Sequence, residues 1–227
     1  MRGYAICTAP RSGSVFLCRL LASTGMLGRP AEYFNASAIR FSRDIPDYPV
    51  DPEAQLAAIS RLAASANGVY GLKLFSNHFD AVKATRWTQL LPSLPFVHLE
   101  RQDLLGQAIS HVRAIQPQQW TSTWAAGGQP VYNRDLINGE LVRLVRAQTR
   151  WRYYFARNGV PVLNLVYEHV MQSPQESVEA VGRLIGLAET PRIDMAQMGD
   201  LKIQRDALNE AWRARFLAEP RDPNHFF

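Results

Sequence analysis

A short polar segment near the N-terminus, Thr8–Ser14, has the residue types of an anion-binding loop. Gly13 lets the backbone approach a ligand closely, and the amide groups at the start of a following helix lack intrahelical partners. Ser12 and Ser14 add hydroxyl donors, and Arg11 adds a forked cation. The loop lacks the first glycine and the lysine of the nucleotide-hydrolase pattern G-x-x-x-x-G-K-S/T. An ordinary capped helix start is the alternative interpretation of this turn.

Arg101 and Ser110 form a second candidate anion site. Arg101 follows an apolar strand pattern at residues 95–99, and a helix capped by Asp103 carries Ser110 on the same stripe as Gln107. We therefore expect both side chains to converge on one anion at the edge of a sheet. A surface arginine beside a helical serine is the alternative that these residues leave open.

Lys73 and His78 are two further residues that can do chemistry. Lys73 lies inside the apolar run Val69–Phe75, where an unpaired ammonium group is costly to bury, so it must pair with an anion or reach solvent. His78 is a candidate general base because imidazole is neutral and basic near pH 7, and a structural role is its alternative.

Alternating strand and helix patterns must position these residues. The predicted strands cover residues 4–7, 69–75, 95–99 and 161–167. Helices are predicted over residues 14–24, 52–66, 78–91, 103–116 and 139–158, and a capping box at Ser173–Glu176 opens another that ends near Gly186. Parallel strands need such crossovers, so the fold class is α/β, a central parallel sheet flanked by helices, with function at the carboxyl ends of the strands.

The chain of 227 residues fits one domain, 1–227, with a surface loop at Asn35–Pro52 and a C-terminal helical tail at 190–227. Its net charge is +5, and 22 of the 25 basic residues are arginine, which favours a polyanionic ligand or a nucleic acid. Two cysteines exclude a disulfide scaffold, and no apolar run reaches the length of a membrane span. A cytoplasmic enzyme is expected.

The Thr8–Ser14 loop resembles the 5′-phosphosulfate loop of sulfotransferases. Segments matching the bacterial trehalose 2-sulfotransferase-like family follow in order, at residues 28–34, 71–74, 96–101, 107–110, 166–168 and 173–174. This resemblance implies a P-loop-like sulfotransferase fold. It also implies transfer of a sulfuryl group from 3′-phosphoadenosine-5′-phosphosulfate (PAPS) to a hydroxyl of a carbohydrate or glycolipid, and pairing as a homodimer.

The resemblance also implies roles for individual residues. It places the general base at Glu32, with His78 as a competing candidate, and Arg11 and Lys73 would stabilise charge on the transferred group. A basic segment near the C-terminus would fold over the nucleotide. The implied donor ligands are Pro10, Arg11, Ser12, Gly13, Ser14, Arg101, Ser110, Lys202 and Arg205.

Arginines recur from Arg143 to Arg157 without an acidic residue among them, and Arg143, Arg146 and Arg150 share one helical face. A solvated face, an acidic acceptor, anionic lipid headgroups and a partner subunit all remain open for this stripe.

The sequence disfavours two other functions. A P-loop-like small-molecule kinase or phosphotransferase is disfavoured by the missing Gly-Lys-Ser/Thr, and a noncatalytic nucleic-acid-binding protein is disfavoured by the strand–helix alternation. The sequence has no cluster with metal-ligand spacing, so no metal is expected.

Overall fold

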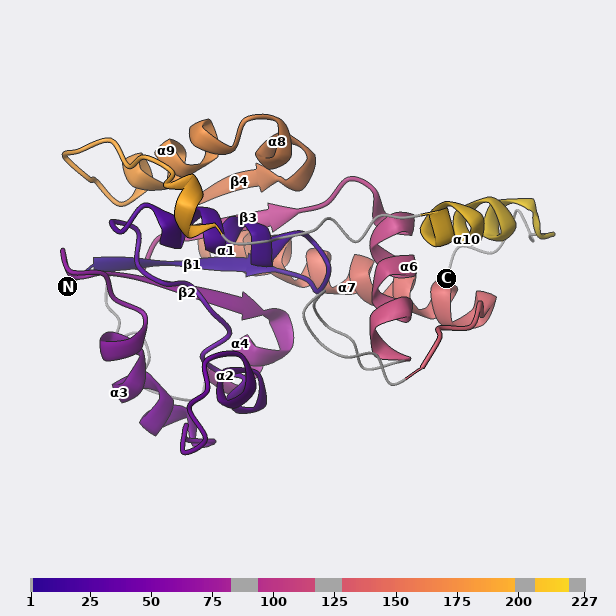
Figure 1. The fold of residues 1–227 in the computed structure, drawn as a ribbon, viewed down its shortest axis with the longest axis horizontal. Helices are drawn as coiled ribbons and strands as arrows, with labels where there is room; N and C mark the ends of the chain where they lie inside the picture. The colour runs from indigo at the N-terminus through magenta and orange to yellow at the C-terminus, as the bar shows by residue number, and fades with distance from the viewer. Residues whose placement is uncertain (1, 83–93, 117–127, 199–206, 221–227) are drawn as a thin grey trace.

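The computed structural model of the protein describes residues 2–82, 94–116, 128–198 and 207–220. Four strands form one parallel sheet in the order β2-β1-β3-β4. They are β1 (Arg2–Thr8), β2 (Val69–Phe75), β3 (Phe96–Glu100) and β4 (Val162–Val166). Their carboxyl ends therefore lie at one edge, on the right in Figure 1. The predicted parallel α/β architecture is confirmed.

Alternating side chains of β1 build an apolar layer on each face of the sheet. Ala5 and Cys7 pack with α2 (Ala36–Ser42), α3 (Pro52–Leu62) and the C-terminal half of α7 (Arg134–Asn158). Tyr4 and Ile6 pack on the other face with helices α1 (Ser14–Ser23), α8 (Tyr167–Gln172) and α9 (Pro174–Leu184). Figure 1 shows α2 and α3 below the sheet and α8 and α9 above it.

A third apolar cluster lies beyond the carboxyl edge of the sheet, where α6 and α10 extend to the right in Figure 1. Ile109 of α6 (Leu104–Ile115), Leu144 of α7 and Trp212 of α10 (Ala207–Ala218) are buried in it. This cluster holds α6 and α10 next to the strand ends that the sequence singled out for function.

Local capping explains where the site-bearing helices begin. The Asp103 carboxylate accepts a hydrogen bond from the Gly106 amide at 2.9 Å, as predicted, and α6 follows it. Helix α7 starts at Arg134, earlier than the predicted Gly139, because Asn133 caps it by accepting from the Leu136 amide at 2.9 Å.

The Asn35–Pro52 segment is not only a loop, as the sequence suggested from its prolines and charges. It contains α2, which Asn35 caps by accepting from the Ala38 amide at 3.2 Å. Ile39 and Tyr48 are each 1 % exposed and pack into the core beside α3, so tertiary burial orders this segment.

The helix predicted after Ser173 is present, but the capping box predicted at Ser173–Glu176 does not form. Helix α9 starts at Pro174 and ends close to Gly186, which has a left-handed φ of 66°. The Ser173 side chain makes no capping bond, and its carbonyl accepts from the Ser177 hydroxyl at 3.2 Å. The Glu176 carboxylate instead lies 3.6 Å from the His169 ring.

The described part of the 190–227 tail consists of a 3-10 turn, η1 (Met195–Gln197), and α10. Among the helices of the described ranges, none combines the length and apolarity that crossing a bilayer requires.

Candidate active site

The loop between β1 and α1 is wound tightly at the end of the sheet. Arg11 and Gly13 have left-handed backbone conformations, with φ of 61° and 84°. A Cβ atom on Gly13 would lie 2.0 Å from Cδ2 of Tyr167, so only glycine fits there. No described side chain caps α1, so its first amide groups keep free donors at the loop. This arrangement is typical of anion-binding loops.

The Ser12 hydroxyl is used inside the loop. Ser12 is buried, its Oγ lies 2.7 Å from Oγ1 of Thr8, and the Thr8 hydroxyl donates to the Leu99 carbonyl at 2.7 Å. Because Thr8 has a single proton, Ser12 must donate to Thr8. The expectation that the Ser12 hydroxyl faces a ligand is therefore wrong, since this bond ties the loop to β3. The Pro10 carbonyl is similarly fixed to α6, accepting from the side-chain amide of Gln107 at 2.7 Å.

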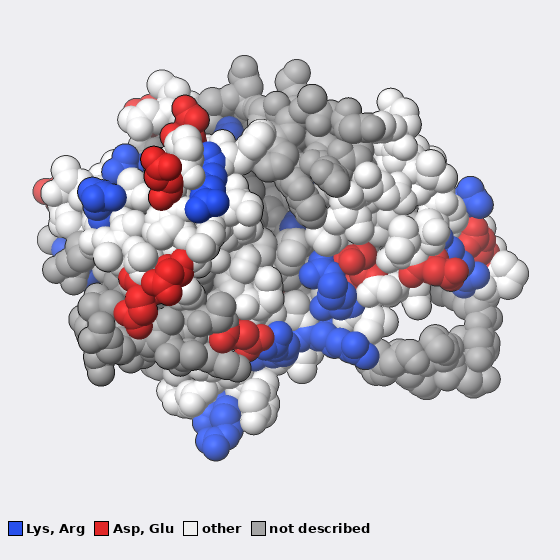
Figure 2. Space-filling view, turned by 90° about the horizontal axis from the view of Figure 1, so that it is seen from below, with Lys and Arg blue, Asp and Glu red and all other residues white. Residues whose placement is uncertain are grey.

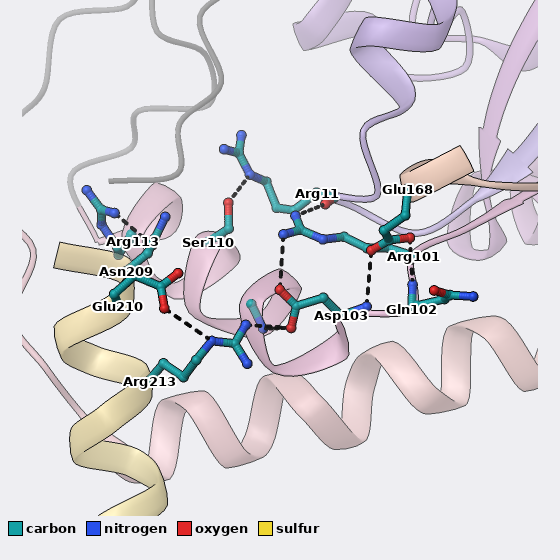
Figure 3. A network of polar contacts seen from close by, with 11 residues as sticks. Arg11, Arg101, Gln102, Asp103, Ser110, Arg113, Glu168, Asn209, Glu210 and Arg213 are labelled. Carbon is teal, nitrogen blue, oxygen red and sulfur yellow. Dashed lines mark hydrogen bonds and ion pairs between the residues drawn. The ribbon is translucent and has the colours of Figure 1, made fainter. Parts of the chain in front are cut away.

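Arg11 and Arg101 form a cationic cluster around Ser110, as Figure 3 shows. Arg11 Nε donates to Ser110 Oγ at 2.9 Å, and Arg101 Nη1 donates to the Arg11 carbonyl at 3.3 Å. Burial, followed by the charges of Arg101 and Arg113, lowers the pKa of Arg11 to about 10. Buried guanidinium groups that repel one another gain stability from a bound anion. Arg11 thus contacts both Ser110 and Arg101, the two residues that we expect to bind one anion.

Arg101 is held in place but keeps one unused donor. Its guanidinium lies 5.3 Å from the ring centroid of Tyr167, and Nη2 is 3.5 Å from Asp103 Oδ2. Its Nε is buried, and none of the described residues accepts a hydrogen bond from it. Glu168 accepts from the backbone amides of Gln102 and Asp103 at 3.1 and 3.2 Å, so it holds this strand end by hydrogen bonds.

Helix α10 is attached to this cluster by Arg213 and Asn209, which sequence reasoning missed. Arg213 Nη2 donates to Asp103 Oδ1 at 2.5 Å, and Arg113 Nη1 donates to Asn209 Oδ1 at 2.7 Å (Figure 3). Burial raises the pKa of Asp103, but hydrogen bonds from Arg213 and the Gly106 amide outweigh it and lower the pKa overall. No local sequence signal links α10 to α6, because the contact depends on packing around Trp212.

Glu32 and Lys73 form a buried ion pair, with Nζ 2.6 Å from Oε1. The backbone places them together, since Ala31 pairs with Leu72 of β2 and its carbonyl accepts from the Lys73 amide at 2.9 Å. Asn35 donates from Nδ2 to the other Glu32 oxygen at 3.1 Å. Asn35 was missed as a site residue, although asparagine before a helix is a recognisable cap. Lys73 thus neither reaches solvent nor lies unpaired.

The ion pair fixes the charge state of both partners. Burial alone would raise the pKa of Glu32, but the charge and hydrogen bond of Lys73, with His78 and Asn35, lower it below its usual value. Burial alone would lower the pKa of Lys73, but Glu32 raises it. Glu32 is therefore an ionised carboxylate that can accept a proton.

His78 lies on α4 (Ser76–Val82) beside this pair. Its ring centroid is 5.2 Å from that of Phe75, and its buried Nδ1 has no hydrogen-bond partner among the described residues. Burial lowers the pKa of His78, the Glu32 charge opposes this shift, and Lys73 adds to it. His78 is thus neutral near pH 7. The rest of the helix predicted to Leu91 lies outside the described residues.

One cavity of about 2200 Å³ joins the two clusters. Arg11, Arg101 and Ser110 line it together with Glu32, Lys73 and His78. Single-ligand pockets measure roughly 300–1,000 Å³, so this cavity has room for two substrates. On the face drawn in Figure 2, Lys and Arg side chains gather near the middle beside a hollow.

Two predicted donor ligands, Lys202 and Arg205, lie outside the described residues. Within the described ranges, no group of three or more His, Cys, Asp or Glu side chains is placed to hold a metal ion.

Known proteins resemble this chain over nearly its whole length. Trehalose 2-sulfotransferase of Mycobacterium tuberculosis is 26% identical, with 96% of this chain and 96% of that protein covered. The enzyme of the same name from Mycolicibacterium smegmatis is also 26% identical, with 94% and 93% covered. Among solved structures, the sulfotransferase domain of the Synechococcus PCC 7002 olefin synthase aligns at 15% identity, with a TM-score of 0.46 and coverage of 97% and 96%.

The model of the Stf0 sulphotransferase family matches residues 3–219. This range includes the Thr8–Ser14 loop, the Glu32–Lys73 pair and Arg101, the features on which the sequence resemblance depended. The chain therefore belongs to the Stf0 sulphotransferase family, and it is a sulfotransferase.

Proposed function

We propose that the protein transfers a sulfuryl group from PAPS to a carbohydrate hydroxyl. The observation that carries this proposal is the joint cavity, in which a cationic loop site and an ionised carboxylate paired with a lysine face the same space. The mycobacterial relatives are named for sulfation of trehalose, so a sugar hydroxyl is the acceptor class to test first.

The residues of the loop site suit the two anionic ends of this donor. The amide groups at the start of α1 and the Arg11 side chain would hold the phosphosulfate, as Gly13 and Ser14 line the cavity with them. Arg101 and Ser110 would hold the 3′-phosphate, and the buried, unused Nε of Arg101 supports this role. PAPS supplies the activated sulfuryl group, and the protein supplies position and charge.

Glu32 is our candidate for the base. It is ionised, lies in the cavity and is oriented by Asn35 and Lys73, so it can take the proton of an acceptor hydroxyl. Lys73 would stabilise negative charge on the transferred group, and as it turns from Glu32 toward that group, the carboxylate becomes a stronger base. Neutral His78, which also lines the cavity, is the second candidate.

Transfer of radiolabelled sulfate tests the proposal. The purified protein is incubated with PAPS carrying ³⁵S and with trehalose, trehalose 6-phosphate or a trehalose glycolipid. We expect label on at least one carbohydrate, and none with heat-treated protein. Protein that binds the nucleotide but labels none of these acceptors would contradict the carbohydrate assignment.

Three further features belong to the same proposal. The enzyme would work without a metal ion, since Arg11 and Lys73 supply the cationic charge, and we expect EDTA to leave turnover unchanged. It acts as a single domain that forms a homodimer, which light scattering coupled to size-exclusion chromatography measures. It acts in the cytoplasm, which fractionation of cells measures.

A further inference from the structure

One wall of the cavity is an arginine face of α7 that the proposed reaction does not use. Arg143, Arg146 and Arg150 line the cavity, and their spacing of three and four residues places them on one side of the helix. Arg157, on the same helix, is exposed and is not among the lining residues. The sequence left the purpose of this stripe open, whereas the structure places part of it in the active-site cavity.

The two outer arginines of this face are fixed by acidic partners. Arg143 pairs with Glu140 at 2.7 Å, and its Nη2 is 3.1 Å from Nδ1 of His111. Arg150 pairs with Asp80 of α4. Arg146 lies between them, is exposed to the cavity, and has no hydrogen bond or ion pair with any residue of the described ranges. Within the described ranges, the face thus presents one guanidinium that makes no hydrogen bond or ion pair, flanked by two oriented ones.

The face spans the two parts of the active site. Arg143 contacts His111, the neighbour of Ser110 at the proposed donor site. Arg150 contacts Asp80, two residues beyond His78, on the side of the proposed base. Along the helix the rise of about 1.5 Å per residue separates these ends by roughly 10 Å. Arg146 and Arg150 therefore lie toward the region that an acceptor must enter to reach Glu32.

The charge of the cavity exceeds what its acidic groups neutralise. Of the described residues that line it, nine are Arg or Lys and four are Asp or Glu. Arg11, Arg101 and Lys73 serve the donor in the proposed reaction, and Arg143 and Arg150 pair with Glu140 and Asp80, which leaves Arg146 without an anionic partner among the described residues. Guanidinium groups match phosphate and carboxylate with paired hydrogen bonds.

We propose that Arg146, flanked by Arg143 and Arg150, binds an anionic group, a phosphate or carboxylate, on the carbohydrate acceptor. This inference rests on the sulfuryl transfer proposed above and narrows its acceptor to sugars that carry a negative charge. The anion on α7 orients the acceptor so that a hydroxyl reaches Glu32 while the donor occupies the loop site.

Calorimetry with two matched sugars tests the inference. The enzyme is saturated with 3′-phosphoadenosine-5′-phosphate (PAP), the donor product, and is titrated with trehalose 6-phosphate or with trehalose. We expect the phosphorylated sugar to bind at least about tenfold more tightly, because hydrogen bonds between charged groups are among the stronger ones. Arg146→Ala should abolish this advantage, Arg146→Lys should keep part of it, and Arg157→Ala should keep all of it.

Several results would overturn the inference. One is equal affinity for the two sugars, or no binding of either to the PAP complex. Another is a loss of PAP affinity in Arg146→Ala, which would place this arginine in the donor site. A third is an equal effect of Arg157→Ala, which would indicate that the acceptor responds only to the overall positive charge of the protein. Failure of the wild type to bind PAP would instead contradict the proposed function itself, so the two failures are distinguishable.

Discussion

At the scale of single residues, the proposed chemistry depends on the Glu32–Lys73 pair. A lysine in an apolar strand had either to pair with an anion or to reach solvent, and Lys73 pairs with Glu32. The identity of that partner followed from no spacing rule, because it depends on Ala31 pairing with Leu72 of β2. The resemblance placed a base at Glu32, but the low pKa that Lys73 gives it is a property of the folded chain.

We expect Glu32→Gln to lower kcat by about 100-fold or more, because general bases contribute roughly that much. The amide keeps the shape of the side chain, so PAP should bind with unchanged affinity. Steady-state kinetics with radiolabelled PAPS and calorimetry measure the two quantities. Glu189→Gln is the matched control, since Glu189 is exposed and does not line the cavity. Full turnover by Glu32→Gln would show that Glu32 is not the base and would leave His78 as the next candidate.

The β1–α1 loop is the element to which we assign donor binding. Its glycine and its place after a strand were readable from the sequence, and α1 begins at Ser14 as predicted. The bond between the Ser12 and Thr8 hydroxyls could not be read from the sequence, because Thr8 is in turn bonded to the Leu99 carbonyl of β3. Helix α2 was also missed because it depends on tertiary contacts. Burial of Ile39 and Tyr48 stabilises a segment whose prolines favour a loop.

We expect Gly13→Ala to weaken PAP binding at least tenfold. The new Cβ would collide with the Tyr167 ring, which contacts Arg101, and a left-handed φ of 84° adds backbone strain of about 1–2 kcal/mol. Gly25→Ala is the matched control, with a φ of 65° and nothing within 4 Å of its Cβ. Urea unfolding should show a strain cost in both variants. Equal PAP affinities in the two variants would show that the loop does not bind the donor.

The contact between α6 and α7 should make stability depend on pH through Glu140. Burial raises the pKa of this carboxyl, but hydrogen bonds from His111 and Arg143 outweigh it and lower the pKa from 4.5 to about 2. A carboxyl with a lowered folded pKa stabilises the protein above its unfolded pKa, and this stabilisation is lost as the pH falls toward the folded value. Glu140→Gln should therefore be less stable than the wild type at pH 7.

The difference in free energy of unfolding between Glu140→Gln and the wild type should shrink as the pH falls from 5 to 3. Urea titrations at several pH values measure it. A difference that stays constant over this range would show that the carboxylate charge contributes nothing.

At the scale of the whole molecule, the net charge of +5 did not distinguish a small polyanion from a nucleic acid. Strand–helix alternation predicted the sheet and its functional edge, because period and crossover length are local properties. The concentration of positive charge in one cavity arises from segments as distant as Arg11, Arg101, Arg146 and Arg213. Only the packing of α6, α7 and α10 beyond the sheet brings these segments together.

This concentration of charge should make PAP binding sensitive to salt. We expect the Kd for PAP to rise at least about tenfold between 50 and 500 mM NaCl. Salt shortens the distance over which the positive charges of the protein attract the phosphates of PAP. The KM for a neutral sugar should change less than twofold over the same range. A salt-independent Kd for PAP would contradict an electrostatic donor site.

The most direct test of the proposed donor site is calorimetry with PAP, with ATP and with adenosine 5′-phosphate, which lacks the 3′-phosphate. Arg101 and Ser110 are assigned to that phosphate, so PAP should bind at least about tenfold more tightly than either of the other nucleotides. Arg101→Ala should remove this preference. Tight binding of ATP together with no binding of PAP would contradict the account.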